Sequence, residues 1–117
     1  MKDTDNLIVR LSFEFSMGII EYCELLESER KYVLANQLLK SGTSIGANIR
    51  EAQNAESKAD FIHKFKIAAK EIDETQYWLE LCLYAKSYPD PVGLPERLMN
   101  IANIANKIII TSKMSNR

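Results

Sequence analysis

One histidine and two cysteines are the side chains in this 117-residue sequence with the clearest potential for catalysis or metal binding. Asp60 and His63 have the carboxylate-x-x-histidine spacing of di-iron helical bundles, but such sites need a matching motif on another helix. The chain has no second histidine, so that site cannot be completed. Cys23 and Cys82 have no histidine at helical spacing that could serve as the base for a nucleophilic thiol. We therefore predict a protein that is not an enzyme and needs no metal or cofactor.

The segment SGTSIGANIREA, residues 41–52, has two glycines that suggest a phosphate-binding loop. A Walker loop has four residues between its glycines and continues with Lys-Ser/Thr after the second one. Here three residues separate Gly42 from Gly46, and Ala47-Asn48 stands in the place of Lys-Ser/Thr. The apolar residues also keep one helical phase through the segment, which predicts a continuous helix rather than a loop.

Within that helix the two glycines form a strip of small residues, where a second backbone can approach closely. Ser44 and Asn48, four residues apart, form a polar seam beside it, for which we expect hydrogen-bond partners on a neighbouring helix or subunit. The residues predicted to make helix-packing or subunit contacts are Gly42, Ser44, Gly46, Asn48 and Glu51.

Basic side chains could form a surface that binds the phosphate backbone of a nucleic acid. Lys66 and Lys70 share a helix face with His63, and the full candidate nucleic-acid-binding set is Lys40, Arg50, Lys58, Lys64, Lys66 and Lys70. The alternative is an ordinary solvated face, because acidic residues close by in the sequence neutralise much of this charge. The net charge of −1 excludes a nucleic-acid binder that relies on overall positive charge.

The adjacent aromatic residues Tyr77 and Trp78 could stack on nucleic-acid bases. The residues one turn from Trp78 are half polar and half apolar, a boundary position that favours packing against the core or an interface. We favour packing for this pair.

Apolar residues recur every three or four positions along most of the chain, and no alternating pattern typical of strands is present. This pattern predicts an all-α protein, an antiparallel up-down four-helix bundle formed by one domain over residues 1–117. The expected helices cover about 5–26, 30–53, 58–87 and 95–114, with a loop rich in proline before the last one. Ser57 with Asp60 resembles a capping box at the start of the third helix.

More apolar residues are present than one bundle interior needs, which predicts a second buried surface between subunits. The surplus residues are Leu25, Leu83, Tyr84, Ile104, Ile109 and Ile110. No apolar run approaches the ~20 residues of a membrane span, and no signal-peptide pattern is present. We expect a cytoplasmic protein with two free buried cysteines, a disulfide being the alternative, and with neither a membrane partner nor a small-molecule substrate.

The segments QLLKSGTSIGANIREA (37–52) and SKADFIHKFKIAAKEIDETQYWLEL (57–81) resemble a family of small four-helix-bundle proteins encoded in intervening sequences of bacterial 23S rRNA genes, the so-called S23 ribosomal protein family. The matching residues are Gln37, Leu38, Ser44, Ile45, Asn48, Ile49 and Glu51, then Asp60-Phe61, Ala68 and Glu71. The resemblance covers about residues 7–112. It implies an antiparallel four-helix bundle and a ring-shaped homopentamer.

A related branch of that family serves as the accessory protein of diversity-generating retroelements, which binds reverse transcriptase and RNA through a basic surface. This sequence departs from that branch at Leu39, where many relatives carry arginine, and in its slightly negative net charge. The resulting hypothesis is a homo-oligomeric accessory or scaffold protein associated with RNA, DNA or a nucleic-acid enzyme. The alternative is a protein–protein interaction scaffold that binds no nucleic acid.

Overall fold

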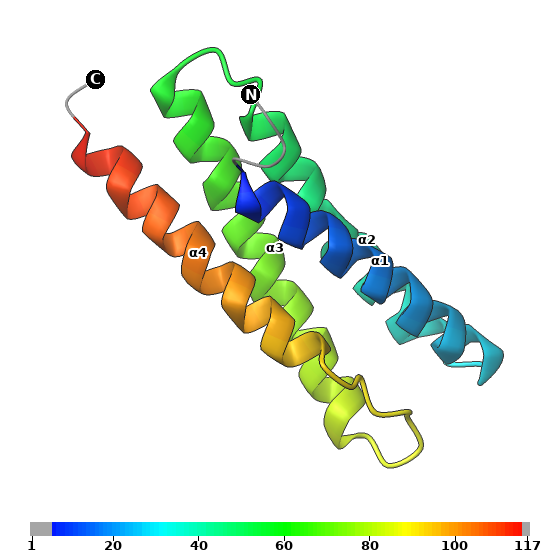
Figure 1. The fold of residues 1–117 in the computed structure, drawn as a ribbon. Coiled ribbons are helices and arrows are strands. Elements are labelled where there is room, and N and C mark those ends of the chain that lie inside the picture. The colour runs from blue at the N-terminus through cyan, green and yellow to red at the C-terminus, as the bar shows by residue number, and fades with distance from the viewer. Residues whose placement is uncertain (1–5, 116–117) are drawn as a thin grey trace.

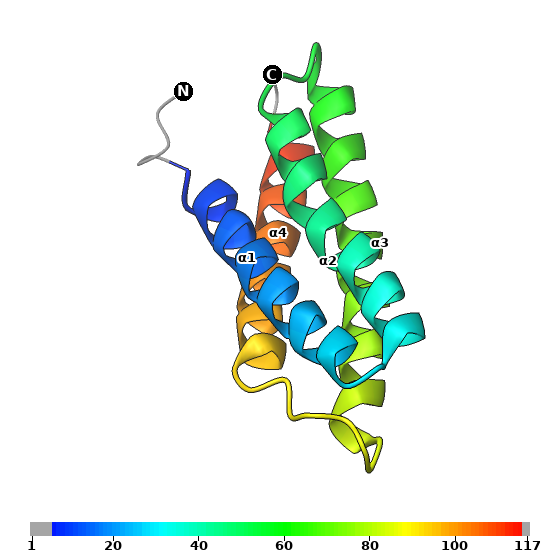
Figure 2. The ribbon, with the colours of Figure 1, turned by 90° about the vertical axis from the view of Figure 1, so that its right-hand side faces the viewer.

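Four α-helices make up most of residues 6–115, the part of the chain that this computed structural model describes, and no strand occurs there. They are α1 (Leu7–Ser28), α2 (Tyr32–Ala52), α3 (Lys58–Tyr84) and α4 (Leu94–Met114). Helix α1 packs against α2 and α4, and α3 packs against the same two helices, whereas no Cα atoms of α1 and α3 approach within 8 Å. Successive helices therefore run up and down in a ring of four (Figures 1 and 2). The predicted all-α four-helix bundle is confirmed.

The bundle interior is built from the apolar stripes of the four helices. Phe15 of α1, Leu38 and Ile45 of α2 and Phe65 of α3 are completely or almost completely buried, and Leu98 and Ile101 of α4 close the core. Each helix alone would be marginally stable in water, so burying these stripes against one another holds the fold together. None of the helices in residues 6–115 combines the length and apolar character needed to cross a lipid bilayer.

Side chains at two helix starts accept hydrogen bonds from backbone N–H groups that have no partner within the helix. Asn6 caps α1 by accepting from the N–H of Val9, and Ser57 Oγ caps α3 by accepting from the N–H of Asp60 at 3.0 Å. The Asp60 carboxylate accepts in turn from the N–H of Glu56. The predicted Ser57–Asp60 cap is confirmed, with the returning bond one residue earlier than in a standard capping box.

The helix ends differ from the expected ones where backbone geometry intervenes. Arg30 has a φ of 64°, so the chain turns there and α2 begins at Tyr32 instead of 30. Helix α3 ends at Tyr84 rather than 87 because Ala85 is already extended. Gly93, with a φ of 81°, leads into α4 at Leu94. The start expected at residue 5 for the first helix lies outside the described residues.

The α1–α2 turn and the α3–α4 connection meet at one end of the bundle. Tyr22 of α1 donates its hydroxyl proton to the carbonyl oxygen of Pro89 at 2.6 Å. Lys31 donates to Ser87 Oγ, and its ammonium group lies 5.0 Å from the centre of the Tyr88 ring. These contacts fix the proline-rich connection against the first half of the chain. Figure 2 shows the connection and the α1–α2 turn at the same end of the bundle.

Candidate interaction surfaces

The two glycines of α2 lie against α1. A Cβ atom added to buried Gly42 would be 2.9 Å from Cγ1 of Ile19, and one added to Gly46 would be 3.3 Å from the carbonyl oxygen of Ser12. The first of these separations is shorter than two carbon atoms can tolerate without movement. The strip of small residues predicted from the sequence thus serves close packing between α1 and α2 within one chain.

The polar seam beside the glycines is bonded locally. Ser44 donates to the carbonyl oxygen of Lys40, and Asn48 donates to that of Ser44, each four residues back in α2. Such bonds to the helix's own carbonyl groups compete with bonds between helices. Both donors therefore have an acceptor within their own helix, and the expected partners on a neighbouring helix or subunit stay a prediction. Glu51, the fifth residue of the predicted set, pairs with Lys64 of α3.

Four of the six basic residues in the candidate nucleic-acid-binding set have a neighbour within the chain. Lys64 Nζ lies 3.0 Å from the Glu51 carboxylate, which raises the pKa of this lysine. Lys58 donates to the carbonyl oxygen of Ser115 near the end of α4. Arg50 stacks over the ring of Phe13 in α1, with its Cζ 5.7 Å from the ring centre.

Lys40, the fourth of these residues, lies near Glu71 of α3. The pKa of Glu71 is raised by burial and by the charge of Glu74, and the charge of Lys40 opposes that rise. These four basic residues thus have their neighbours on α1, α2, α3 and just after α4. His63, Lys66 and Lys70 form a short exposed stripe along α3, which we call the α3 basic stripe.

The cysteines lie in the interior near the α3–α4 connection, together with Tyr22. They belong to α1 and α3, whose Cα atoms stay more than 8 Å apart, whereas a disulfide needs Cα atoms less than about 7 Å apart. Both thiols are free, as predicted. Burial raises the pKa of Cys23 to about 12 and also raises that of Cys82, so neither thiol has the thiolate character of a reactive cysteine.

Trp78 takes the boundary position that its sequence neighbours indicate. Its ring is half-buried and packs against the core, and its Nε1–H donates to the Glu74 carboxylate at 3.1 Å. Its neighbour Tyr77 is more exposed, with the two ring centres 5.2 Å apart. The packing interpretation of Trp78 is therefore supported. Among residues 6–115, no three side chains of the His, Cys, Asp and Glu types are arranged to hold a metal ion.

The surplus apolar residues divide into two groups. Ile104 and Ile109 are partly buried and pack against the core of their own bundle. Leu25, Leu83, Tyr84 and Ile110 are exposed, and the exposed fraction of Tyr84 reaches 80%. These four are available for contacts with another molecule.

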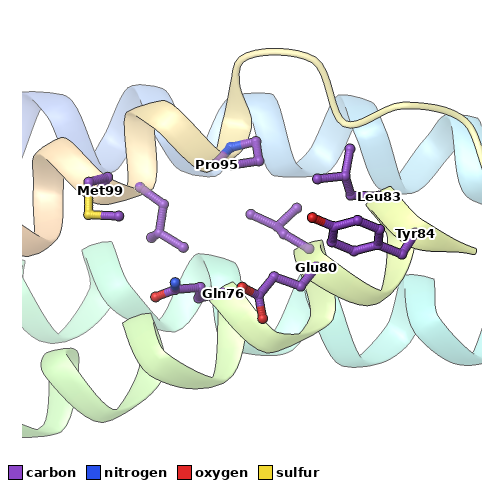
Figure 3. Close-up of a pocket in the computed structure, with 8 residues that line it drawn as sticks. Gln76, Glu80, Leu83, Tyr84, Pro95 and Met99 are labelled. Atoms are coloured by element: carbon purple, nitrogen blue, oxygen red, sulfur yellow. The ribbon is translucent and has the colours of Figure 1, made fainter.

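Leu83 and Tyr84 contribute to an apolar groove between the C-terminal half of α3 and the first turns of α4. This α3–α4 groove has a volume of about 150 Å³, and it is lined by Gln76, Leu79, Glu80, Leu83, Tyr84, Pro95, Leu98 and Met99. Figure 3 shows Tyr84 at one end and Met99 at the other, with Gln76 and Glu80 along the α3 edge and Pro95 along the α4 edge. The floor of this groove is aliphatic, and the charged side chain that lines it is the carboxylate of Glu80.

A second exposed surface was not found from the sequence. Phe13 is 52% exposed between α1 and α2, where Val9, Arg10 and Arg50 surround it. We call these four residues the Phe13 patch. The sequence does show that Phe13 lies outside the main apolar stripe of α1. That position does not show whether a neighbouring helix covers the ring.

The chain is similar to known proteins in both sequence and structure. Residues 4–110 match the family model described as 23S rRNA-intervening sequence protein. A crystal structure of a protein with unknown function from the S23 ribosomal protein family of Bacteroides thetaiotaomicron is 40% identical in sequence. The alignment covers 88% of this chain and 98% of that chain, with a TM-score of 0.83. No curated protein matches the chain.

The family match covers most of the chain and includes both segments on which the sequence resemblance rests. The similar structure carries the same four-helix fold across nearly its whole length. The chain belongs to the family of 23S rRNA-intervening sequence proteins.

Proposed function

We propose that the protein is a non-enzymatic scaffold that works as a homo-oligomer in the cytoplasm. The observation that carries this proposal is the pair of half-exposed apolar surfaces, the α3–α4 groove and the Phe13 patch, on a bundle whose core is already complete. Apolar groups gathered at a concave surface with a polar edge are typical of sites that bind another molecule. Free buried thiols fit a reducing compartment, and their raised pKa values argue against thiol catalysis.

Light scattering coupled to size-exclusion chromatography tests the homo-oligomer. We expect a mass several times that of one chain at micromolar concentration, five copies being the number that the family resemblance implies. The expected association buries apolar surface, so the oligomer should persist at physiological salt. A mass of one chain across the micromolar range would contradict the proposal.

A second candidate function is association with RNA or DNA, and the α3 basic stripe is the observation that favours it. Lys66 and Lys70 are exposed one turn apart beside His63, and the acidic residues Asp73 and Glu74 follow one turn after Lys70. The two ammonium groups of Lys66 and Lys70, one turn apart, could follow a phosphate backbone. The short stripe would give weak binding with a shallow dependence on salt concentration.

Binding of a labelled single-stranded RNA at low salt tests this candidate. We expect the Lys66→Glu/Lys70→Glu variant to lose binding, and the wild-type dissociation constant to rise with salt. The matched control is Lys86→Glu/Lys107→Glu, which changes the net charge equally at two exposed positions outside the stripe. Equal losses in both variants, or no binding by the wild type, would rule out a stripe-directed function.

A further inference from the structure

The α3–α4 groove has the size and the lining of a binding site for one aromatic ring. A cavity of about 150 Å³ lined by aliphatic side chains holds a benzene molecule in other proteins, and this groove has a volume of about 150 Å³. Leu79, Leu83 and Leu98 contribute its apolar lining, and Glu80 stands at its α3 edge (Figure 3). An occupant with a phenyl ring beside a cation would therefore match both its shape and its charge.

The Phe13 patch of the same chain presents such a group. Phe15 and Phe65 are buried and Phe61 packs against the core, whereas the ring of Phe13 is 52% exposed. The guanidinium of Arg50 lies over this ring, and Arg10 lines the same surface. Arg10 also approaches Glu14, but only to 4.0 Å and with more than half of its side chain exposed. A phenyl ring flanked by two cations is thus displayed on the surface.

We propose that Phe13 of one copy inserts into the α3–α4 groove of a second copy, with Arg10 and Arg50 facing Glu80 of that copy. This inference rests on the proposed homo-oligomer and identifies the two surfaces through which its copies meet. The ring fills the aliphatic groove, and the guanidinium groups lie against the carboxylate at its edge. Opposite charges at the rim set the orientation and disfavour the reverse arrangement.

The two surfaces lie on different pairs of helices, which decides the symmetry of the contact. The Phe13 patch belongs to α1 and α2, and the groove belongs to α3 and α4, on the other side of the ring of helices. One copy therefore uses different surfaces for its two neighbours, which is a heterologous contact. Heterologous contacts continue beyond two copies and give closed rings or filaments.

Two variants that each remove one side of the contact test this arrangement. Phe13→Glu keeps the groove but loses the ring, and Leu83→Glu keeps the ring but introduces a charge into the groove. Both positions are about half exposed, so the helical fold should tolerate them, as circular dichroism will show. We expect each variant alone to be monomeric. A mixture of the two should form a one-to-one dimer, because one intact ring and one intact groove remain.

Matched controls separate this contact from other apolar surfaces. Val33→Glu changes an exposed residue of α2 outside the Phe13 patch, and Leu81→Glu changes an exposed residue of α3 outside the groove. Both controls should keep the wild-type mass. A Leu83→Glu or Phe13→Glu variant of wild-type mass, or a mixture that stays monomeric, would overturn the proposed contact. A wild-type protein that is itself a monomer would instead contradict the proposed homo-oligomer.

A charge exchange gives a second test at exposed positions. Arg50→Glu or Glu80→Arg should each raise the dissociation constant of the assembly at least tenfold at low salt. The double variant Arg50→Glu/Glu80→Arg should recover most of this loss, because it restores opposite charges across the contact. Losses that simply add in the double variant would show that the two residues do not face each other and would overturn the arrangement.

Discussion

The hydroxyl groups of Ser41 and Thr75 meet in the core, with their oxygen atoms 2.9 Å apart across the interface between α2 and α3. Thr75 Oγ1 also lies 2.7 Å from the carbonyl oxygen of Glu71, which can only accept a hydrogen bond. Because Thr75 has one hydroxyl proton, donating it to Glu71 makes Ser41 the donor in the bond between the helices. Both residues are almost fully buried, so this pair links α2 to α3 at a fixed register.

Replacing one member of this pair should destabilise the bundle. Thr75→Val removes the acceptor of the buried Ser41 hydroxyl, which should lower the free energy of unfolding by about 1–2 kcal/mol. Ser41→Ala should cost about 1 kcal/mol, and the double variant should lose less than the sum of the two. Urea denaturation of all four proteins measures these differences. Strictly additive losses would show that the two hydroxyl groups are not coupled.

A methyl group at Gly42 should destabilise the bundle, although alanine favours helices over glycine by about 1 kcal/mol. Its Cβ would be 2.9 Å from Cγ1 and 3.0 Å from Cγ2 of Ile19, a buried branched side chain with little room to move. Overpacking of this kind costs about 1–3 kcal/mol, so we expect a net loss for Gly42→Ala.

The matched control for this prediction is Gly18→Ala. The nearest atom to that Cβ is Nη1 of Arg97, at 2.8 Å, which is the free end of a flexible side chain. Cδ2 of Leu94, at 3.1 Å, need move only slightly, so Gly18→Ala should stay within about 1 kcal/mol of the wild type. Thermal unfolding that ranks Gly42→Ala at or above Gly18→Ala would refute the steric explanation.

Loss of the Tyr22 hydroxyl should loosen the α3–α4 connection. Tyr22→Phe removes the 2.6 Å hydrogen bond to the Pro89 carbonyl oxygen, which should lower the free energy of unfolding by about 1 kcal/mol. Limited proteolysis should also cut residues 85–93 faster than in the wild type. Tyr32→Phe, at an exposed position, is the control and should change neither measurement. Unaltered cleavage of 85–93 in Tyr22→Phe would show that this bond does not secure the loop.

The helical fold could be predicted because spacing alone identifies a buried stripe on each helix. Leu38, Ser41 and Ile45 keep one phase through the two glycines of α2, and the structure buries all three. The turn between α1 and α2 was less predictable, because the left-handed backbone of Arg30 is uncommon for arginine and leaves no signal in its side-chain type.

The candidate surfaces were harder to predict, since they depend on register between helices. Lys64 lies beside Glu51 only because α2 and α3 are antiparallel with these positions level, which no single-helix pattern shows. Ser44 and Asn48 each donate to a carbonyl group of their own helix, a local bond that their spacing alone did not reveal. Phe13 was missed because its exposure depends on how far α2 covers α1.

The stability of the protein should fall as the pH rises above about 9, because the Cys23 thiol must be neutral in the folded state. Burial raises its pKa from an ordinary value of 9.0 to about 12, and its Sγ lies 3.4 Å from the carbonyl oxygen of Ala35. Its contribution is therefore fully present below the unfolded pKa and is lost as the pH rises from about 9 towards the folded pKa. Urea midpoints measured across this window should fall less in Cys23→Ala than in the wild type, and a thiol reagent at about pH 8 should label the cysteines only after unfolding. Rapid labelling of the folded protein, or identical pH profiles for the two proteins, would contradict the burial of this thiol.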